Sequence, residues 1–199
     1  MVGEGKDDNI AVLAEQEFDK FVQIAGSDKG GAVIFAGSDS DAPHIDKLVK
    51  SLKDYNIPVQ VRICSAHKEP ERLIRLLMQY QNMVDAPLVY IAVAGGADAL
   101  SGILSFHANG PVISSPPDAT PDKPNMSCLA NPPGSSNLYI SRPENVGKAV
   151  AQILYYSDPE LDKYGDMLNT AREEKVNTLQ KKDREFMIKY SQPTEQGGK

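Results

Sequence analysis

The stretch GSDSDAPHIDKL, residues 37–48, directly follows the apolar run AVIFA, residues 32–36, and this junction decides the fold. An uninterrupted apolar run of this length is typical of a strand that is buried on both faces. The small, acidic and hydroxyl residues after it predict a tight turn, and Ile45 and Leu48 begin the apolar face of a helix. A buried strand that leads directly into a helix indicates a parallel α/β sheet.

The same alternation of strand and helix continues through the middle of the chain. Further strands are predicted at 57–64, 86–95 and 111–117, and helices at 41–55, 69–83, 97–108 and 143–156. This order implies a three-layer α/β/α sandwich with a parallel, flavodoxin-like sheet. Right-handed crossovers would place the carboxyl ends of the strands along one edge. The Pro-, Asp-, Asn- and Ser-rich loop over 117–137 is long enough to indicate a functional loop.

Both ends of the chain add a predicted helix to this unit. Residues 1–8 are predicted to be disordered and 9–25 to form an amphipathic helix. A long charged helix near the carboxyl terminus, running to about residue 187, is too long to bury itself against one small domain. We therefore expect it to pack on a neighbouring subunit, with a solvated arm as the alternative. The expected parts are an N-terminal extension over 1–30, an α/β domain over 31–157, and an oligomerisation helix and tail over 158–199.

The composition narrows the class of function. The chain has 199 residues, with 21 Lys and Arg against 27 Asp and Glu, and its net charge is −6. This charge argues against nucleic acid as the main partner, because phosphate backbones need clustered Lys and Arg. No run reaches the about 18 apolar residues of a membrane span, and the polar N-terminus lacks a signal core, so we expect a cytoplasmic protein. Cys64 and Cys128 lack metal or redox spacing and are expected to be reduced thiols.

Unusual residues follow three successive predicted strands. The segments are Gly37-Ser38-Asp39-Ser40-Asp41, Ser65-Ala66-His67-Lys68 and Ala94-Gly95-Gly96-Ala97-Asp98-Ala99-Leu100-Ser101-Gly102. Ligands of open parallel sheets bind outside the carboxyl ends of the strands. We therefore expect the three segments to line one site.

Several of these residues have both a binding and a structural interpretation. The hydroxyls of Ser38 and Ser40, with free backbone N–H groups, favour an anion such as phosphate, and Asp41 can accept hydrogen bonds from sugar hydroxyls. The same residues also suit helix capping. Lys68 is either a point charge for a phosphate or a solvated charge. The Gly95-Gly96 pair either allows close approach of a flat ligand or simply makes a tight turn.

His67 is the strongest candidate for proton chemistry, because it follows an apolar strand and an imidazole can give or take a proton at neutral pH. The alternative is a histidine that caps or hydrogen-bonds the backbone. His44 and His107 are expected to have structural or surface roles. The spacing of the three histidines indicates no metal site.

The motifs G-S-x-S-D, S-A-H-K and A-G-G-x-x-A-L-S-G, together with P-V-I-S-S-P-P and Pro133-Gly134, resemble the phosphoribosylaminoimidazole carboxylase family of purine biosynthesis. The resemblance covers roughly residues 31–157. One branch of this family carboxylates aminoimidazole ribonucleotide with CO2, and the other rearranges an N-carboxylated ribonucleotide into the same product. Lys68 and the Ala99–Gly102 segment are similar to the direct carboxylases. Gly96 and Ala130 stand where that branch commonly has arginines, which leaves Lys68, Lys123 or backbone N–H groups as phosphate donors.

The resemblance implies that His67 removes the proton from the ring carbon that has attacked CO2, with CO2 as co-substrate and no metal, ATP or biotin. It also implies the substrate-binding residues, which are Ser38, Ser40, Asp41, Ser65, Lys68, Gly95, Gly96, Ala97, Leu100 and Ser101. Members of the family are homo-oligomers, so a tetramer or octamer is expected. The alternatives are the mutase reaction, since that branch shares the glycine pair, and a nucleotide-binding module without catalysis.

Overall fold

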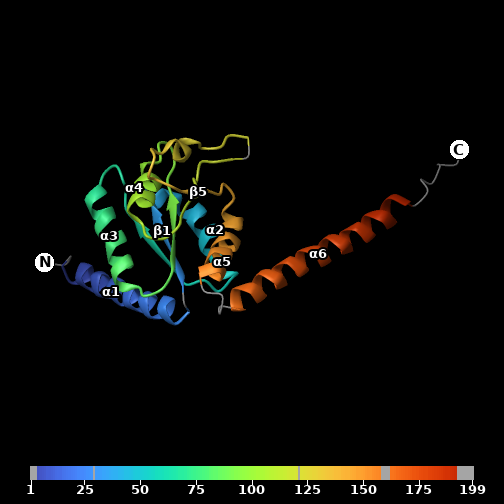
Figure 1. Ribbon diagram of the computed structural model, residues 1–199, viewed down its shortest axis with the longest axis horizontal. Coiled ribbons are helices and arrows are strands. Elements are labelled where there is room, and N and C mark those ends of the chain that lie inside the picture. Colours follow the sequence, from blue (N-terminus) through green and yellow to red (C-terminus); the bar gives the residue numbers. More distant parts are fainter. Residues whose placement is uncertain (1–3, 29, 121, 158–161, 192–199) are drawn as a thin grey trace.

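A five-stranded parallel sheet forms the centre of the protein (Figure 1). The computed structural model describes residues 4–28, 30–120, 122–157 and 162–191. The strand order is β2-β1-β3-β4-β5. The strands are β1 (Gly31–Ala36), β2 (Val59–Ile63), β3 (Leu88–Val93), β4 (Val112–Ser114) and β5 (Leu138–Tyr139). All neighbouring pairs are parallel, so the carboxyl ends of the strands meet at one edge.

Helices cover both faces of this sheet (Figure 1). The helices are α1 (Glu4–Ser27), α2 (Ala42–Lys53), α3 (Pro70–Met83), α4 (Ala99–His107), α5 (Val146–Ser157) and α6 (Asp162–Ser191). Side chains of α1, α3 and α4 share one buried cluster with Val33 and Phe35 of β1. Side chains of α2 and α5 share another with Ala32 and Ile34, which point to the opposite face of the same strand. The predicted three-layer α/β/α sandwich with a flavodoxin-like sheet is confirmed.

The central strands form because their residues suit burial on both faces. All six residues of β1 and all six of β3 are buried. Each large aliphatic or aromatic side chain removed from water in this way contributes about 1.5–3 kcal/mol. The continuous apolar runs that predicted these strands therefore reflect their central place in the sheet.

The ends of the chain agree with the predicted helices, with one difference. The helix α1 begins at Glu4, so the prediction of disorder is wrong for residues 4–8, while residues 1–3 lie outside the described part of the chain. The segment contains no proline, and a helix that has already nucleated propagates through such residues. The long last helix is present as α6, which contacts α5 and then projects away from the body (Figure 1). None of the described helices is both long and apolar enough to span a bilayer.

Two smaller features were not predicted. The strand β5 has only two residues, which is too short to show a periodic pattern, and it exists because it pairs with β4. The predicted loop over 117–137 contains a short 3₁₀ helix at Ser127–Ala130. The thiols of Cys64 and Cys128 are buried and form no disulfide.

Candidate active site

A pocket of about 280 Å³ opens at the carboxyl ends of β1, β2 and β3. It is lined by Gly37, Ser38, Asp41, Ser65, Ala66, His67, Ala94, Gly95, Ala97 and Leu100, and we call it the His67 pocket. All three segments that follow the predicted strands contribute to this lining. The parallel topology therefore brings together residues that are far apart in the sequence, as expected for a ligand site of an open α/β sheet.

A second pocket of about 380 Å³ adjoins the first, since Asp41 and Gly95 line both. We call it the His44 pocket. Its other lining residues are Ser40, Pro43, His44, Lys47, Pro117 and Asp118. Predicted site residues are therefore divided between two adjoining spaces. Lys68, Gly96 and Ser101 lie outside both linings.

In the loop after β1, one residue caps a short helix and another has a carboxylate that caps nothing. The Ser40 N–H donates to Ser38 Oγ at 3.2 Å and the Ser40 hydroxyl donates to the same oxygen at 2.9 Å, so Ser38 caps the 3₁₀ helix Asp39–Asp41. Asp41 makes no side-chain capping bond to α2. Burial raises the pKa of the Asp41 carboxyl, and the negative charge of Asp118 adds to this effect. Ser38 therefore caps the 3₁₀ helix, while the carboxylate of Asp41 lines the pocket and takes no part in capping α2.

The loop after β2 presents His67 to the pocket. The Lys68 and Glu69 N–H groups both donate to Ser65 O, at 3.2 and 2.8 Å, which closes a tight turn before α3. This turn leaves Ser65 half-buried and Ala66 buried, while His67 and Lys68 are exposed. An exposed imidazole in a pocket lining can reach both a bound ligand and water, as a group that exchanges protons must.

The turn after β3 depends on Gly96 and Asp98. Gly96 has φ +65, which is in the left-handed region that glycine adopts without strain. The buried Asp98 carboxylate accepts from Ser101 N–H at 2.8 Å and from Ser114 Oγ at 3.1 Å, so it caps α4 and ties it to β4. Ser101 is fully buried, which separates its hydroxyl from the His67 pocket. Its predicted contact with substrate therefore has no support in this geometry.

The loop over 117–137 packs against the glycine turn. Asp118 Oδ2 accepts from Gly96 N–H at 2.9 Å, and Gly96 O accepts from Asn125 Nδ2 at 3.0 Å and from Ser127 Oγ at 2.9 Å. Partial burial opposes ionisation of Asp118, but the hydrogen bonds from Gly96 and Asn125 outweigh it and lower the pKa of this carboxyl. The loop thus helps to hold the turn that lines the site.

His44 lies closer to the site than its sequence position indicated. Its Nε2 is 3.1 Å from the Oγ of Ser115, the first residue after β4, and burial lowers the pKa of this imidazole. A signal was available, because His44 falls three residues after Asp41 in the first turn of α2. Lys47, one turn later, places a cation in the same pocket. His107, in contrast, ends α4 and lines neither pocket.

No group of three His, Cys, Asp or Glu side chains in the described ranges is arranged to hold a metal ion. The polar groups that line the two pockets are hydroxyls, carboxylates, imidazoles and one lysine, Lys47. Such a set can bind hydroxyls and an anion and can move a proton.

Comparisons with known proteins show which family this chain is similar to. A family model described as AIR carboxylase matches residues 32–177. The chain is 35% identical over 129 residues to a phosphoribosylaminoimidazole carboxylase of Archaeoglobus fulgidus. This match covers 64% of this chain and 70% of that protein. It is 33% identical over 134 residues to an N5-carboxyaminoimidazole ribonucleotide mutase of Methanocaldococcus jannaschii. That match covers 65% of this chain and 82% of the mutase.

A solved structure shows the same likeness. The crystal structure of Treponema denticola PurE aligns with a TM-score of 0.72 at 29% identity, over 78% of this chain and 98% of that one. The matched region of the family model begins in β1 and includes every segment that lines the two pockets. It leaves α1 outside. The chain therefore belongs to the AIR carboxylase family.

Proposed function

We propose that this protein carboxylates 5-aminoimidazole ribonucleotide (AIR) with CO2 to give 4-carboxy-5-aminoimidazole ribonucleotide, a reaction of purine biosynthesis. The observation that carries this proposal is the lining of the His67 pocket, where an imidazole, two serine hydroxyls, a carboxylate and a glycine meet. These groups suit a flat heterocycle joined to a sugar phosphate. Membership of the family supports either the carboxylase or the mutase reaction.

In the proposed mechanism, His67 acts as the base. The amino group of the imidazole donates electrons into the ring, and ring carbon 4 attacks CO2, so that a new C–C bond forms. The same carbon still carries its proton, and the ring is not aromatic until that proton leaves. The neutral imidazole of His67 takes the proton and later releases it to water, to which it is exposed. In the reverse reaction the protonated imidazole returns the proton to the ring.

The remaining residues of the pockets would bind the substrate. Ser38 and Ser65 would hydrogen-bond the phosphate, and Asp41 would accept from the ribose hydroxyls. Gly95 lines both pockets and has no side chain, so its backbone would allow the close approach of a flat ring. Lys47 is a further candidate for the phosphate cation, beside Lys68 and Lys123. The proposed reaction uses CO2 as co-substrate and no metal, ATP or biotin.

The second candidate is the mutase reaction on N5-carboxyaminoimidazole ribonucleotide. It is supported by the Methanocaldococcus jannaschii relative, whose name states that activity, and by the Gly95-Gly96 pair that the sequence shares with the mutase branch. In that reaction the same imidazole would take the ring proton after the carboxyl group has moved from nitrogen to carbon.

Two assays on the purified protein separate these reactions. The first supplies AIR with bicarbonate and CO2, and the second supplies N5-carboxyaminoimidazole ribonucleotide without added bicarbonate. The proposal predicts turnover in the first assay that rises with CO2. Turnover in the second assay alone would identify a mutase, and AIR binding without turnover in either assay would identify a binding module. His107→Asn is the matched control for His67→Asn, because it changes a histidine outside both pockets.

A further inference from the structure

Asp118 is a charged residue of the site to which the proposed mechanism gives no part. It lines the His44 pocket together with Asp41 and Gly95, and these two residues line the His67 pocket as well. A Cβ added at Gly95 would lie 3.4 Å from the Asp118 carboxyl. The carboxyl of Asp118 therefore lies directly beside the glycine that the substrate ring is proposed to approach.

The Asp118 carboxylate is held in one position and keeps part of its capacity to accept hydrogen bonds. Its Oδ2 accepts from Gly96 N–H at 2.9 Å, and Asn125 Nδ2 donates to Oδ1 at 3.0 Å and to Oδ2 at 3.3 Å. An ionised carboxylate offers about four acceptor positions on its two oxygens, so positions remain for a ligand. Asp118 is exposed and lines the pocket, so a ligand can reach them.

The lining of the His44 pocket is negative overall. It contains two carboxylates, those of Asp41 and Asp118, and one ammonium group, that of Lys47. Burial lowers the pKa of His44, so this imidazole is uncharged at neutral pH. Partial burial opposes ionisation of Asp118, but its hydrogen bonds outweigh this effect and lower its pKa, so the carboxylate is charged. A positive charge that forms beside this pocket is therefore stabilised.

The proposed reaction creates such a charge on its substrate. When ring carbon 4 attacks CO2, the lone pair of the amino group moves into the bond to carbon 5, and the amino nitrogen becomes positive. Carbon 5 is bonded to the ring nitrogen that carries the ribose, so the amino group lies on the ribose side of the ring. Asp41, the proposed partner of the ribose hydroxyls, lines the same pocket as Asp118. Binding in this orientation directs the amino group towards Asp118.

We propose that Asp118 is a further catalytic residue of this site, an inference that rests on the proposed function. Its carboxylate accepts a hydrogen bond from the amino group of AIR and stabilises the positive charge that forms there. No proton passes to Asp118, because the amino group keeps both of its hydrogens. Carbon 4 loses its proton to His67, and the electrons of that C–H bond restore the aromatic ring and return the lone pair to nitrogen. A fixed charge aimed at a charge that develops in the transition state is an effective means of catalysis.

A cycle of binding measurements tests the contact between Asp118 and the amino group. Titration calorimetry without CO2 compares AIR with the analogue in which hydrogen replaces the amino group. The wild type should bind AIR about tenfold more tightly, because the analogue cannot donate to the charged acceptor. Asp118→Asn keeps one acceptor oxygen, which Gly96 N–H occupies, so its preference should be about threefold or less. A loosened turn that weakens both ligands equally leaves this ratio unchanged.

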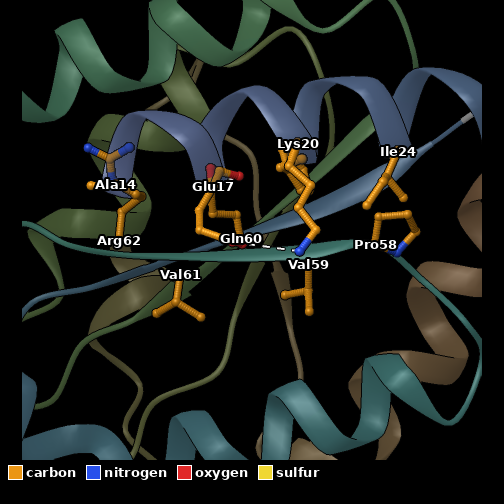
Figure 2. A pocket seen from close by; sticks show the side chains of 10 residues that line it. Ala14, Glu17, Lys20, Ile24, Pro58, Val59, Gln60, Val61 and Arg62 are labelled. Atoms are coloured by element: carbon orange, nitrogen blue, oxygen red, sulfur yellow. Dashed lines mark hydrogen bonds and ion pairs between the residues drawn. The ribbon is translucent and has the colours of Figure 1, made fainter. Parts of the chain in front are cut away.

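Loss of the charge should also slow the reaction. In single-turnover reactions at saturating CO2, Asp118→Asn should carboxylate AIR about 10–10²-fold more slowly than the wild type. Two control variants also remove one negative charge and should behave as the wild type in both assays. Asp122→Asn changes an exposed carboxylate of the same loop that lines neither pocket. Glu17→Gln changes an exposed carboxylate of the separate groove between α1 and β2, where Figure 2 shows this side chain.

The role of Asp118 and the proposed function fail in different ways. An unchanged preference for AIR in Asp118→Asn, or a rate within about threefold of the wild type, would overturn the role of Asp118 while the proposed reaction stands. Equal losses in either control variant, or a wild type that binds the analogue as tightly as AIR, would overturn it too. A wild type that neither binds nor carboxylates AIR would instead contradict the proposed function, and this role with it.

Discussion

Asp98 offers a test of how the glycine turn of the site is held in place. Its carboxylate is buried and accepts hydrogen bonds from Ser101 N–H at 2.8 Å and from Ser114 Oγ at 3.1 Å. Its own N–H donates to Ser127 Oγ at 3.1 Å. The side chain of Asp98 thus joins the start of α4 to β4, and its backbone N–H adds a bond to the loop after β4, directly beside the residues that line the His67 pocket.

The cost of removing this carboxylate follows from the two donors that it satisfies. In Asp98→Ala, Ser101 N–H and the Ser114 hydroxyl lose their acceptor in a fully buried environment. A buried donor without a partner costs about 1–3 kcal/mol. The loss of both predicts destabilisation by about 2–5 kcal/mol, which includes the loss of a helix cap. Asp98→Asn keeps the shape and one acceptor oxygen, so its cost should be about half.

Urea unfolding followed by circular dichroism at one protein concentration measures this effect. With an m-value of about 3 kcal/mol/M, the midpoint of Asp98→Ala should fall by about 1 M. Asp46→Ala removes an exposed carboxylate of α2 and serves as the control, with a change within about 0.5 kcal/mol. A midpoint for Asp98→Ala that equals that of the control would refute the role given to this residue.

Three further predictions concern packing and pH. Gly147→Ala should destabilise the protein by about 3 kcal/mol or more in thermal denaturation, because an added Cβ would lie 1.9 Å from Ser51 O where α5 crosses α2. The pKa of Asp118 is lowered by folding, so its contribution to stability is present above about pH 4 and is lost as the pH falls through the lower folded-state value. Asp118→Asn should therefore weaken the dependence of the urea midpoint on pH between 3 and 5. Folding also lowers the pKa of His44, so its contribution to stability is present above about pH 6.5 and is lost on acidification. Between pH 7.5 and 5, the urea midpoint of His44→Gln should therefore fall less than that of the wild type.

The sheet could be predicted because its pattern is local. The strands β1 and β3 are buried on both faces, so every residue of each is apolar or small, and the turn residues after them are visible in the sequence. Once these strands are taken as parallel, their carboxyl ends must lie at one edge. His67, Ser38 and Gly95 could therefore be assigned to one pocket from the order of the elements alone.

The parts that the sequence did not reveal depend on contacts between distant residues. The strand β5 has two residues and is defined by its pairing with β4. The His44 pocket forms because the first turn of α2 lies beside the loop after β4, and no sequence period links His44 to Ser115 or Asp118. Ser101 was expected in the site as part of a motif, but Asp98 caps its N–H and its hydroxyl faces the interior.

The most direct test of the central claim is the rate of AIR carboxylation at saturating CO2 in single-turnover reactions with His67→Asn. We expect a fall of about 10²–10⁴-fold with little change in the affinity for AIR, because asparagine keeps much of the shape of the side chain but cannot accept the ring proton. His107→Asn should react at the wild-type rate. A rate within tenfold of the wild type for His67→Asn would contradict the assignment of this imidazole as the base.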